Sequence, residues 1–263
     1  MKLSFLWVLL LLSLAQTVSS QTICVEKPYS FSSGEKLHYE ISYNWGFIWI
    51  NAGEVHFEAS EVQFGKEDVF HFFSTGQSYS RWDWLFKVRD TFEVYSRRTD
   101  LQAIFYRRHT LEGGFRIHNN YYFDSQRQLY LAEMDETKKG FRTDTIAISG
   151  CTYDVLTATY VARSIDFKNH AAGDTIDLQL LLDGRTFILP VVFKGRERIK
   201  NRNGAWWDCI LFAAMLDRGT MFKPGEALLI WVSDDTHKIP IMMEAKIAVG
   251  SIKIYLKSAT AYN

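Results

Sequence analysis

One stretch decides the fold of this chain, Lys36-Leu37-His38-Tyr39-Glu40-Ile41-Ser42-Tyr43-Asn44-Trp45, in which polar and apolar side chains alternate at every position. Successive side chains of a β-strand point to opposite faces, so a period of two indicates a strand with one dry and one wet face. Gly34-Glu35 opens the stretch and Gly46 closes it. We therefore predict a strand here, with the odd-numbered residues on its dry face.

Similar segments follow along the chain, separated by polar or Gly-containing turns. They lie at residues 54–59, 69–74, 91–97, 104–111, 115–123, 129–134 and 141–148, and this succession predicts an antiparallel meander. A second series lies at 175–182, 186–194, 196–202, 205–212, 228–233, 239–249 and 251–256. Asp183-Gly184 and Asn203-Gly204 predict two tight hairpins, because both central residues of such turns adopt positive φ. Pro240 indicates an edge or the start of a strand.

A helix interrupts the strands between the two series. Thr152 is a suitable N-cap for a helix from Tyr153 to about Ser164, with Asp154 in its first turn and Arg163 near its end, as the helix dipole favours. The segment is apolar on most sides, so we expect it to be buried as a plug or buttress for the sheet.

The predicted fold is mainly β, a large antiparallel meander that forms a curved sheet or a partly open β-barrel with one buried helix. Two β domains hinged near Gly150 are the alternative. Because no Pro- or Ser-rich linker marks a boundary, we predict a single β-rich domain over residues 21–263.

The N-terminus predicts export. Lys2 precedes an apolar run at 3–14, and small or polar residues follow, which is the order of a signal peptide over residues 1–20 cleaved after Ser20. The apolar run is too short for a membrane span, and no later stretch approaches that length. Gln21-Thr22-Ile23 separates Cys24 from the cleavage point, so we expect no lipid anchor and a soluble periplasmic protein.

The charge and the cysteines narrow the function further. Thirty basic residues oppose thirty acidic ones, and removal of Lys2 with the signal leaves 29 against 30, a net charge of −1. Nothing in this balance indicates nucleic-acid binding, which demands a basic surface. The odd set Cys24, Cys151 and Cys209 allows one disulfide with one free thiol; the alternative is buried thiols, or Cys24 on a mobile tail.

The densest aromatic cluster is Trp82-Asp83-Trp84-Leu85-Phe86, flanked by Arg81, Lys87 and Arg89. If exposed, Trp82, Trp84 and Phe86 would form a hydrophobic lip for a lipid or acyl chain, or a stacking platform for sugar rings. The alternative is that these side chains pack as core over one mouth of the barrel.

Acidic residues provide the second set of candidates. Asp234-Asp235 ends a strand before His237 and is suited to bind calcium or to act as a glycosidase carboxylate, with Asp90 or Glu112 as the second carboxyl. Adjacent aspartates also form turns, which is the alternative.

The remaining motifs predict no metal, cofactor or catalytic residue. His38 and His56 occupy polar phases of their strands and His71 lies between two phenylalanines, so we interpret them as surface or hydrogen-bonded histidines. HExxH and GxSxG motifs are absent. Cys151 lies at the predicted helix start, where a thiol pKa can fall, but a buried structural cysteine is the simpler interpretation.

Several segments, taken together, resemble a known family. They are Gly34-Glu35-Lys36-Leu37-His38-Tyr39-Glu40-Ile41-Ser42-Tyr43, Phe86-Lys87-Val88-Arg89-Asp90, Tyr153-Asp154-Val155-Leu156, Leu229-Ile230-Trp231-Val232-Ser233-Asp234-Asp235, Lys238-Ile239-Pro240 and Val249-Gly250-Ser251-Ile252. The chain resembles the exported bacterial proteins of the DUF3108 family over nearly its whole length. The resemblance implies a single β-rich domain in the envelope of a Gram-negative-type bacterium. It supplies no catalytic residue.

Three functions remain open from the sequence. The leading hypothesis is a non-enzymatic periplasmic protein that binds a hydrophobic or lipid-like ligand or an envelope partner. The alternatives are an envelope glycan hydrolase with paired carboxylates, which needs two carboxyls in one cleft, and a structural or assembly module with no pocket but an exposed edge or apolar patch.

Overall fold

The computed structural model describes residues 23–45, 48–148, 150–216, 226–246 and 250–260. These residues form one 15-stranded sheet with the order β8-β7-β6-β5-β4-β3-β2-β1-β15-β14-β13-β12-β11-β10-β9. The strands are β1 (Glu35–Trp45), β2 (Ile48–Phe64), β3 (Glu67–Ser78), β4 (Val88–Arg97), β5 (Ala103–Glu112), β6 (Phe115–Asp124), β7 (Leu129–Glu136), β8 (Gly140–Ala147), β9 (Thr152–Tyr153), β10 (Thr175–Leu182), β11 (Arg185–Lys200), β12 (Trp206–Leu216), β13 (Glu226–Ser233), β14 (Pro240–Lys246) and β15 (Ser251–Ala259).

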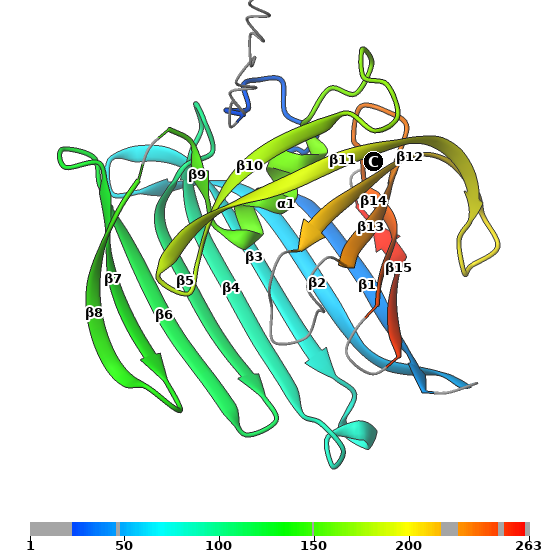
Figure 1. The fold of residues 1–263 in the computed structure, drawn as a ribbon, viewed down its shortest axis with the longest axis horizontal. Coiled ribbons are helices and arrows are strands. Elements are labelled where there is room, and N and C mark those ends of the chain that lie inside the picture. Colours follow the sequence, from blue (N-terminus) through cyan, green and yellow to red (C-terminus); the bar gives the residue numbers. More distant parts are fainter. Residues whose placement is uncertain (1–22, 46–47, 149, 217–225, 247–249, 261–263) are drawn as a thin grey trace, which may run out of the picture.

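The sheet consists of two meanders joined where β1 pairs with β15. All pairs are antiparallel except the short β9–β10 pair. The sheet curves around helix α1 (Val155–Arg163), and its edge strands β8 and β9 do not pair with each other within the described part of the chain (Figure 1). The predicted curved, partly open sheet with one helix is therefore confirmed. The predicted signal peptide lies outside the described residues.

Helix α1 begins two residues later than the sequence indicates. Thr152 and Tyr153 form β9, and Asp154 is the N-cap, its carboxylate accepting hydrogen bonds from the backbone N–H groups of Leu156 and Thr157 at 2.9 Å each. Aspartate is a strong N-cap because its side chain satisfies N–H groups that lack a partner in the first turn. The helix is largely buried, as predicted, and the Tyr160 ring stacks on Phe72 at 4.1 Å.

The hairpins of the second meander differ from the prediction at two places, within β11 and at the Asn203-Gly204 turn. Asp183 and Gly184 both have positive φ, as the tight turn requires. The segments 186–194 and 196–202, however, are parts of one strand, β11, which bends at Gly195 (φ 123°) beside a bulge. At the far end the turn closes from the Gly204 N–H to the Asn201 carbonyl at 2.9 Å, and positive φ falls on Gly204 but not on Asn203.

A buried ion pair joins the two meanders at α1. The Arg163 guanidinium contacts both oxygens of Glu35 on β1, at 2.7 and 2.8 Å. It also donates to the carbonyls of His237 and Lys238 in the β13–β14 turn and of Ser30. Each of these contacts is charge-assisted, which compensates the guanidinium for its burial.

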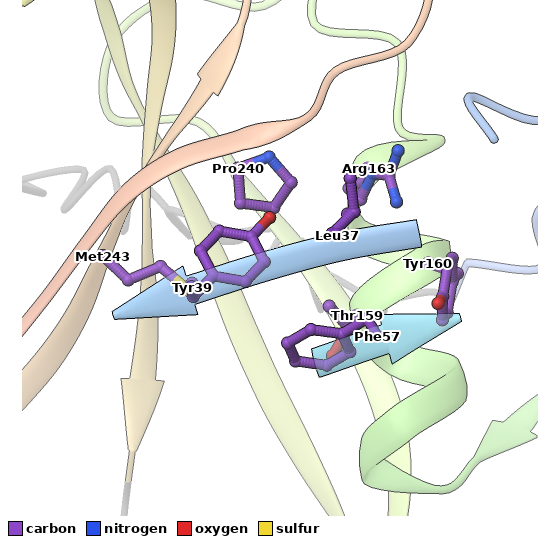
Figure 2. Close-up of a pocket in the computed structure, with 8 residues that line it drawn as sticks. All are labelled: Leu37, Tyr39, Phe57, Thr159, Tyr160, Arg163, Pro240 and Met243. Carbon is purple, nitrogen blue, oxygen red and sulfur yellow. The ribbon is translucent and has the colours of Figure 1, made fainter. Parts of the chain in front are cut away.

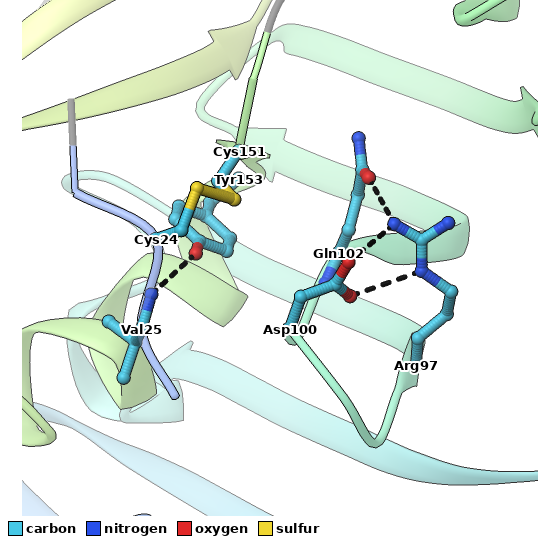
Figure 3. The surroundings of a disulfide bond; sticks show 7 residues. All are labelled: Cys24, Val25, Arg97, Asp100, Gln102, Cys151 and Tyr153. Carbon is cyan, nitrogen blue, oxygen red and sulfur yellow. Dashed lines mark hydrogen bonds and ion pairs between the residues drawn. A yellow bond between two sulfur atoms is a disulfide. The ribbon is translucent and has the colours of Figure 1, made fainter. Parts of the chain in front are cut away.

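A disulfide links Cys24, ahead of β1, to Cys151, just before β9, and Cys209 is a free buried thiol (Figure 3). Next to the disulfide, the Val25 N–H donates to the Tyr153 hydroxyl at 3.3 Å. Of the two alternatives for the three cysteines, the structure shows the one with a single disulfide and one free thiol.

The pocket that the structure shows between the sheet and α1 is small. This apolar pocket is lined by residues of β1, β2, α1 and β14, among them Tyr39, Phe57 and Met243, and it holds about 20 Å³ (Figure 2). This is about the volume that one water needs. An acyl chain does not fit in it.

Candidate binding surface at the hairpin ends

The β3–β4 loop is held in a defined shape by hydrogen bonds at its base. It contains a short 3₁₀ turn at Ser80–Trp82. Asp83 accepts a bond from the Ser78 hydroxyl at 2.6 Å and forms an ion pair with Arg89 at 2.6 Å. The Ser78 hydroxyl and the Arg89 guanidinium hold the pKa of Asp83 below its ordinary value. The carboxylate therefore stays charged and keeps the loop closed.

This closed base projects three apolar side chains into solvent. Trp84, Leu85 and Phe86 are 75%, 46% and 51% exposed. The Phe86 ring lies against the β5–β6 turn, where a Cβ on Gly113 would come within 3.0 Å of it. These three side chains are therefore exposed on a loop whose shape is fixed by its hydrogen bonds and by the contact with the β5–β6 turn.

The β1–β2 hairpin presents its own apolar end beside this loop. Ile48 and Trp49 are 67% and 43% exposed. The two elements touch, because the Trp82 indole N–H donates to the Asn51 carbonyl at 2.8 Å. We call the exposed set of Ile48, Trp49, Trp84, Leu85 and Phe86 the aromatic rim. Figure 1 shows both elements at the lower end of the sheet.

Basic side chains flank the aromatic rim. The Lys253 ammonium lies 5.5 Å from the centroid of the Trp49 ring, and the Arg81 guanidinium lies 5.8 Å from the Trp82 ring. Arg81 also donates to the Asn51 carbonyl at 3.2 Å. Lys87 follows Phe86 directly and is exposed. The surface therefore combines exposed rings with positive charge.

The structure places the predicted aromatic residues in two roles. Trp82 is half-buried and anchors the loop, whereas Trp84 and Phe86 point outward. Neither Trp84 nor Phe86 packs as core over a mouth of the sheet.

Asp90 lies on β4 and, unlike its neighbour Arg89, faces the inner side of the sheet. It pairs with Thr110, and Glu112 lies two residues further along β5 on the same face. Burial, and then the charge of Glu112, raise the pKa of Asp90 to about 7. Its Oδ1 atom is buried and accepts no hydrogen bond within the described residues. Asp90 and Glu112 therefore form a carboxylate pair.

Asp234 and Asp235 lie elsewhere, in the β13–β14 turn at the opposite end of the molecule in Figure 1. Strands β3, β2, β1, β15 and β14 separate β4 from β13 in the sheet. Asp234 forms an ion pair with Arg196 at 3.0 Å, and Asp235 accepts bonds from the N–H groups of His237 and Lys238. Asp235 thus shapes the turn, and the structure does not bring this pair together with Asp90 or Glu112.

The histidines have partners that the alternation of β1 does not reveal. His38 and His56 stack on neighbouring strands and share the carboxylate Glu54, whereas His71 bonds Glu93 at 3.1 Å on another part of the sheet. Glu54 is not among the site residues predicted from the sequence. Its spacing of two from His56, which places both on one face of a strand, is the signal that could have found it.

The profile of the DUF3108 family, described as a protein of unknown function, matches residues 38–257. The chain belongs to the DUF3108 family. The resemblance seen in the sequence is thereby confirmed for this DUF3108 protein. Among curated proteins, none matches the sequence.

Two solved structures are similar to this DUF3108 protein. The β-barrel-like protein of domain of unknown function DUF1849 from Brucella abortus has a TM-score of 0.56 and 9% identity, covering 88% of this chain and 98% of that one. At this identity the likeness shows the fold alone. A lipoprotein candidate from Parabacteroides distasonis has 11% identity over 91% of this chain and 100% of that one, and its TM-score of 0.29 carries no argument.

Within its described residues, the DUF3108 chain contains no helix long and apolar enough to cross a bilayer.

Proposed function

We propose that this protein is an exported, non-enzymatic envelope protein that binds an anionic lipid surface through its aromatic rim. The observation that carries the proposal is the exposure of Trp84, Leu85 and Phe86 in succession on a loop with a hydrogen-bonded base. Contiguous exposed apolar side chains on a soluble domain commonly mark interaction sites. The pocket beside α1, of about 20 Å³, is too small to enclose a lipid, so the exposed rim is the better candidate for lipid binding.

The chemistry of the rim fits the interface of a bilayer. Indole and phenyl rings favour the headgroup region, and burial of a large apolar side chain contributes roughly 1.5 to 3 kcal/mol. Lys87 and Arg81 stand beside the rings and would contact anionic headgroups, each adding about 1 kcal/mol, whereas Lys253 is already paired with Glu244 at 3.2 Å. The two contributions together favour an anionic membrane over a neutral one.

An envelope location agrees with two further features. The Cys24–Cys151 disulfide is of the kind that forms in oxidising compartments such as the periplasm. Residues 1–20 have the pattern of a signal peptide. Both support a periplasmic protein, which would meet the surface of a membrane after export.

The test is binding of the purified mature chain to sedimented vesicles of phosphatidylcholine with and without phosphatidylglycerol. We expect Trp84→Ala/Phe86→Ala to weaken binding to anionic vesicles by at least about tenfold, since two large apolar contacts are lost. The matched control is Trp206→Ala, because Trp206 is 57% exposed beside Arg198 and Lys200 at the β11–β12 end.

The proposal is wrong if the wild-type chain binds neither type of vesicle. It is also wrong if the Trp206 variant and the rim variant lose the same amount of binding, because binding would then be non-specific. If the wild-type chain binds neutral vesicles as tightly as anionic ones and only the rim variant loses binding, the apolar side chains bind the lipid and the basic side chains do not contribute.

The Asp90–Glu112 pair supports a second candidate, hydrolysis of an envelope glycan by two carboxyl groups, of which Asp90 has the raised pKa. Diagonal neighbours on adjacent strands lie about 7 to 8 Å apart, within the range of glycosidase pairs. Release of soluble fragments from purified murein sacculi, lost in Asp90→Asn, would support this candidate. No release by the wild-type chain would exclude that substrate.

A further inference from the structure

His38 and His56 stand directly opposite each other on β1 and β2, on the outer face of the sheet. Their rings are stacked, with centroids 4.1 Å apart and planes 14° apart. The next pair along the two strands on the same face is Glu40 with Glu54. Glu54 is thus two residues from His56 and diagonal to His38, so one carboxylate can reach both rings.

The distances already approach those of a metal site. The His38 Nε2 atom lies 3.2 Å from Glu54 Oε2, and the His56 Nε2 atom lies 4.0 Å from Glu54 Oε1. One ligand atom from each of the three residues lies within 4.8 Å of the others. Ligands of a tetrahedral zinc ion with bonds of about 2.0 to 2.1 Å are about 3.3 Å apart, so only side-chain rotations would be needed.

A neighbouring strand orients the carboxylate. Gln77 on β3 lies opposite Glu54 and donates to its Oε1 atom at 2.7 Å. Such an outer contact leaves Oε2 directed toward His38 and is typical of metal-ligating carboxylates. The side chains of His38, Glu54 and His56 are 26%, 21% and 43% exposed, so an aqueous ion can reach them.

We infer that His38, Glu54 and His56 form a binding site for a divalent transition metal ion of the Zn²⁺ type. Two imidazoles and one carboxylate suit Zn²⁺ and leave a fourth position for water or an exogenous ligand. The site lies on the outer face of β1 and β2, and it is independent of the aromatic rim at the hairpin ends.

The same face carries an internal comparison. His109 and His118 also stand opposite each other, on β5 and β6, with ring centroids 4.4 Å apart. The following residue in that row, Asp135, pairs with Arg116 at 3.0 Å, and no third ligand atom joins these histidines in a cluster within the described residues. Two neighbouring imidazoles without a carboxylate in reach should bind Zn²⁺ much more weakly.

The test is calorimetric titration of the purified mature chain with ZnCl₂. We expect one Zn²⁺ per chain, and binding at least about tenfold weaker in His56→Ala and in Glu54→Gln, which keeps the shape of the side chain but removes its charge. The matched control, His109→Ala/His118→Ala, should bind as the wild type does. Circular dichroism shows whether each variant is folded.

Three results would overturn the inference. They are an absence of Zn²⁺ binding by the wild-type chain, unchanged binding by folded His56→Ala and Glu54→Gln, and loss of binding in the His109/His118 control. If His56→Ala does not fold, Glu54→Gln alone decides, because it leaves both stacked rings in place.

Discussion

The two meanders of this sheet use the same face differently. A single cross-strand row runs from β12 through β1 to β4 and contains Leu211, Trp231, Met242, Tyr255, Glu40, Glu54, Gln77 and Arg89. Residues that stand opposite each other share one face. The second meander thus presents apolar side chains where the first presents charged and polar ones.

The reason is the long β11–β12 hairpin. It bends at Gly195, and its end returns to β1 and β15, where Arg202 donates to Glu40 at 2.9 Å and Asn201 donates to the Leu256 carbonyl at 2.9 Å. Trp231 and Cys209 are buried in a second core on this side. Among the described residues, no comparable hairpin returns over the first meander, and the proposed lipid and metal sites lie on its outer face and hairpin ends.

The largest effect is expected where the two meanders are joined. Arg163→Met leaves Glu35 buried without its partner and removes the bonds to the β13–β14 turn, so we expect a loss of roughly 3 to 5 kcal/mol in the free energy of unfolding. Denaturant titration measures it. The control is Arg196→Met, which removes an exposed ion pair with Asp234 and should cost no more than about 1 kcal/mol. Equal costs would show that the buried pair does not join the meanders.

A somewhat smaller effect is expected from the disulfide, which links the segment before β1 to the residue just before β9. Cys24→Ser/Cys151→Ser should lower the free energy of unfolding by roughly 2 to 5 kcal/mol, because the bond closes a loop of 127 residues in the unfolded chain.

Burial raises the pKa of the Cys209 thiol to about 12, so the native wild-type chain should not react with thiol reagents. Rapid labelling of Cys209 in the native chain would contradict this.

The smallest effect concerns the inner face of the first meander. The pKa of Asp90 is raised above its ordinary value to about 7, so protonation favours the folded chain and this stabilisation is lost as the pH rises through about 7. Asp90→Asn should therefore be more stable than the wild type at pH 8, by on the order of 1 kcal/mol, and the difference should shrink by pH 5. Thermal melts at both pH values measure it. A difference that does not change with pH would contradict the assignment.

The sequence predicts the meander because the alternation of polar and apolar residues depends only on neighbouring positions. It predicts the aromatic loop because three aromatic residues, Trp82, Trp84 and Phe86, lie within five positions. It does not predict the partners of His38. With Trp45 opposite Ile48, simple counting places Val55 opposite His38, but a bulge at Ala52 shifts the register by one residue and brings His56 there. The sequence also predicts two strands on either side of Gly195, because a glycine at a bend within one strand looks the same in the sequence as a glycine in a turn between two.

The most direct test of the proposed function is quenching of tryptophan fluorescence by anionic vesicles with brominated acyl chains. The structure predicts that the wild-type chain and Trp206→Phe are quenched alike, whereas Trp84→Phe loses a large part of the quenching because its indole no longer enters the bilayer interface. Full quenching of Trp84→Phe together with loss in Trp206→Phe would contradict the assignment of the lipid-binding surface to the aromatic rim.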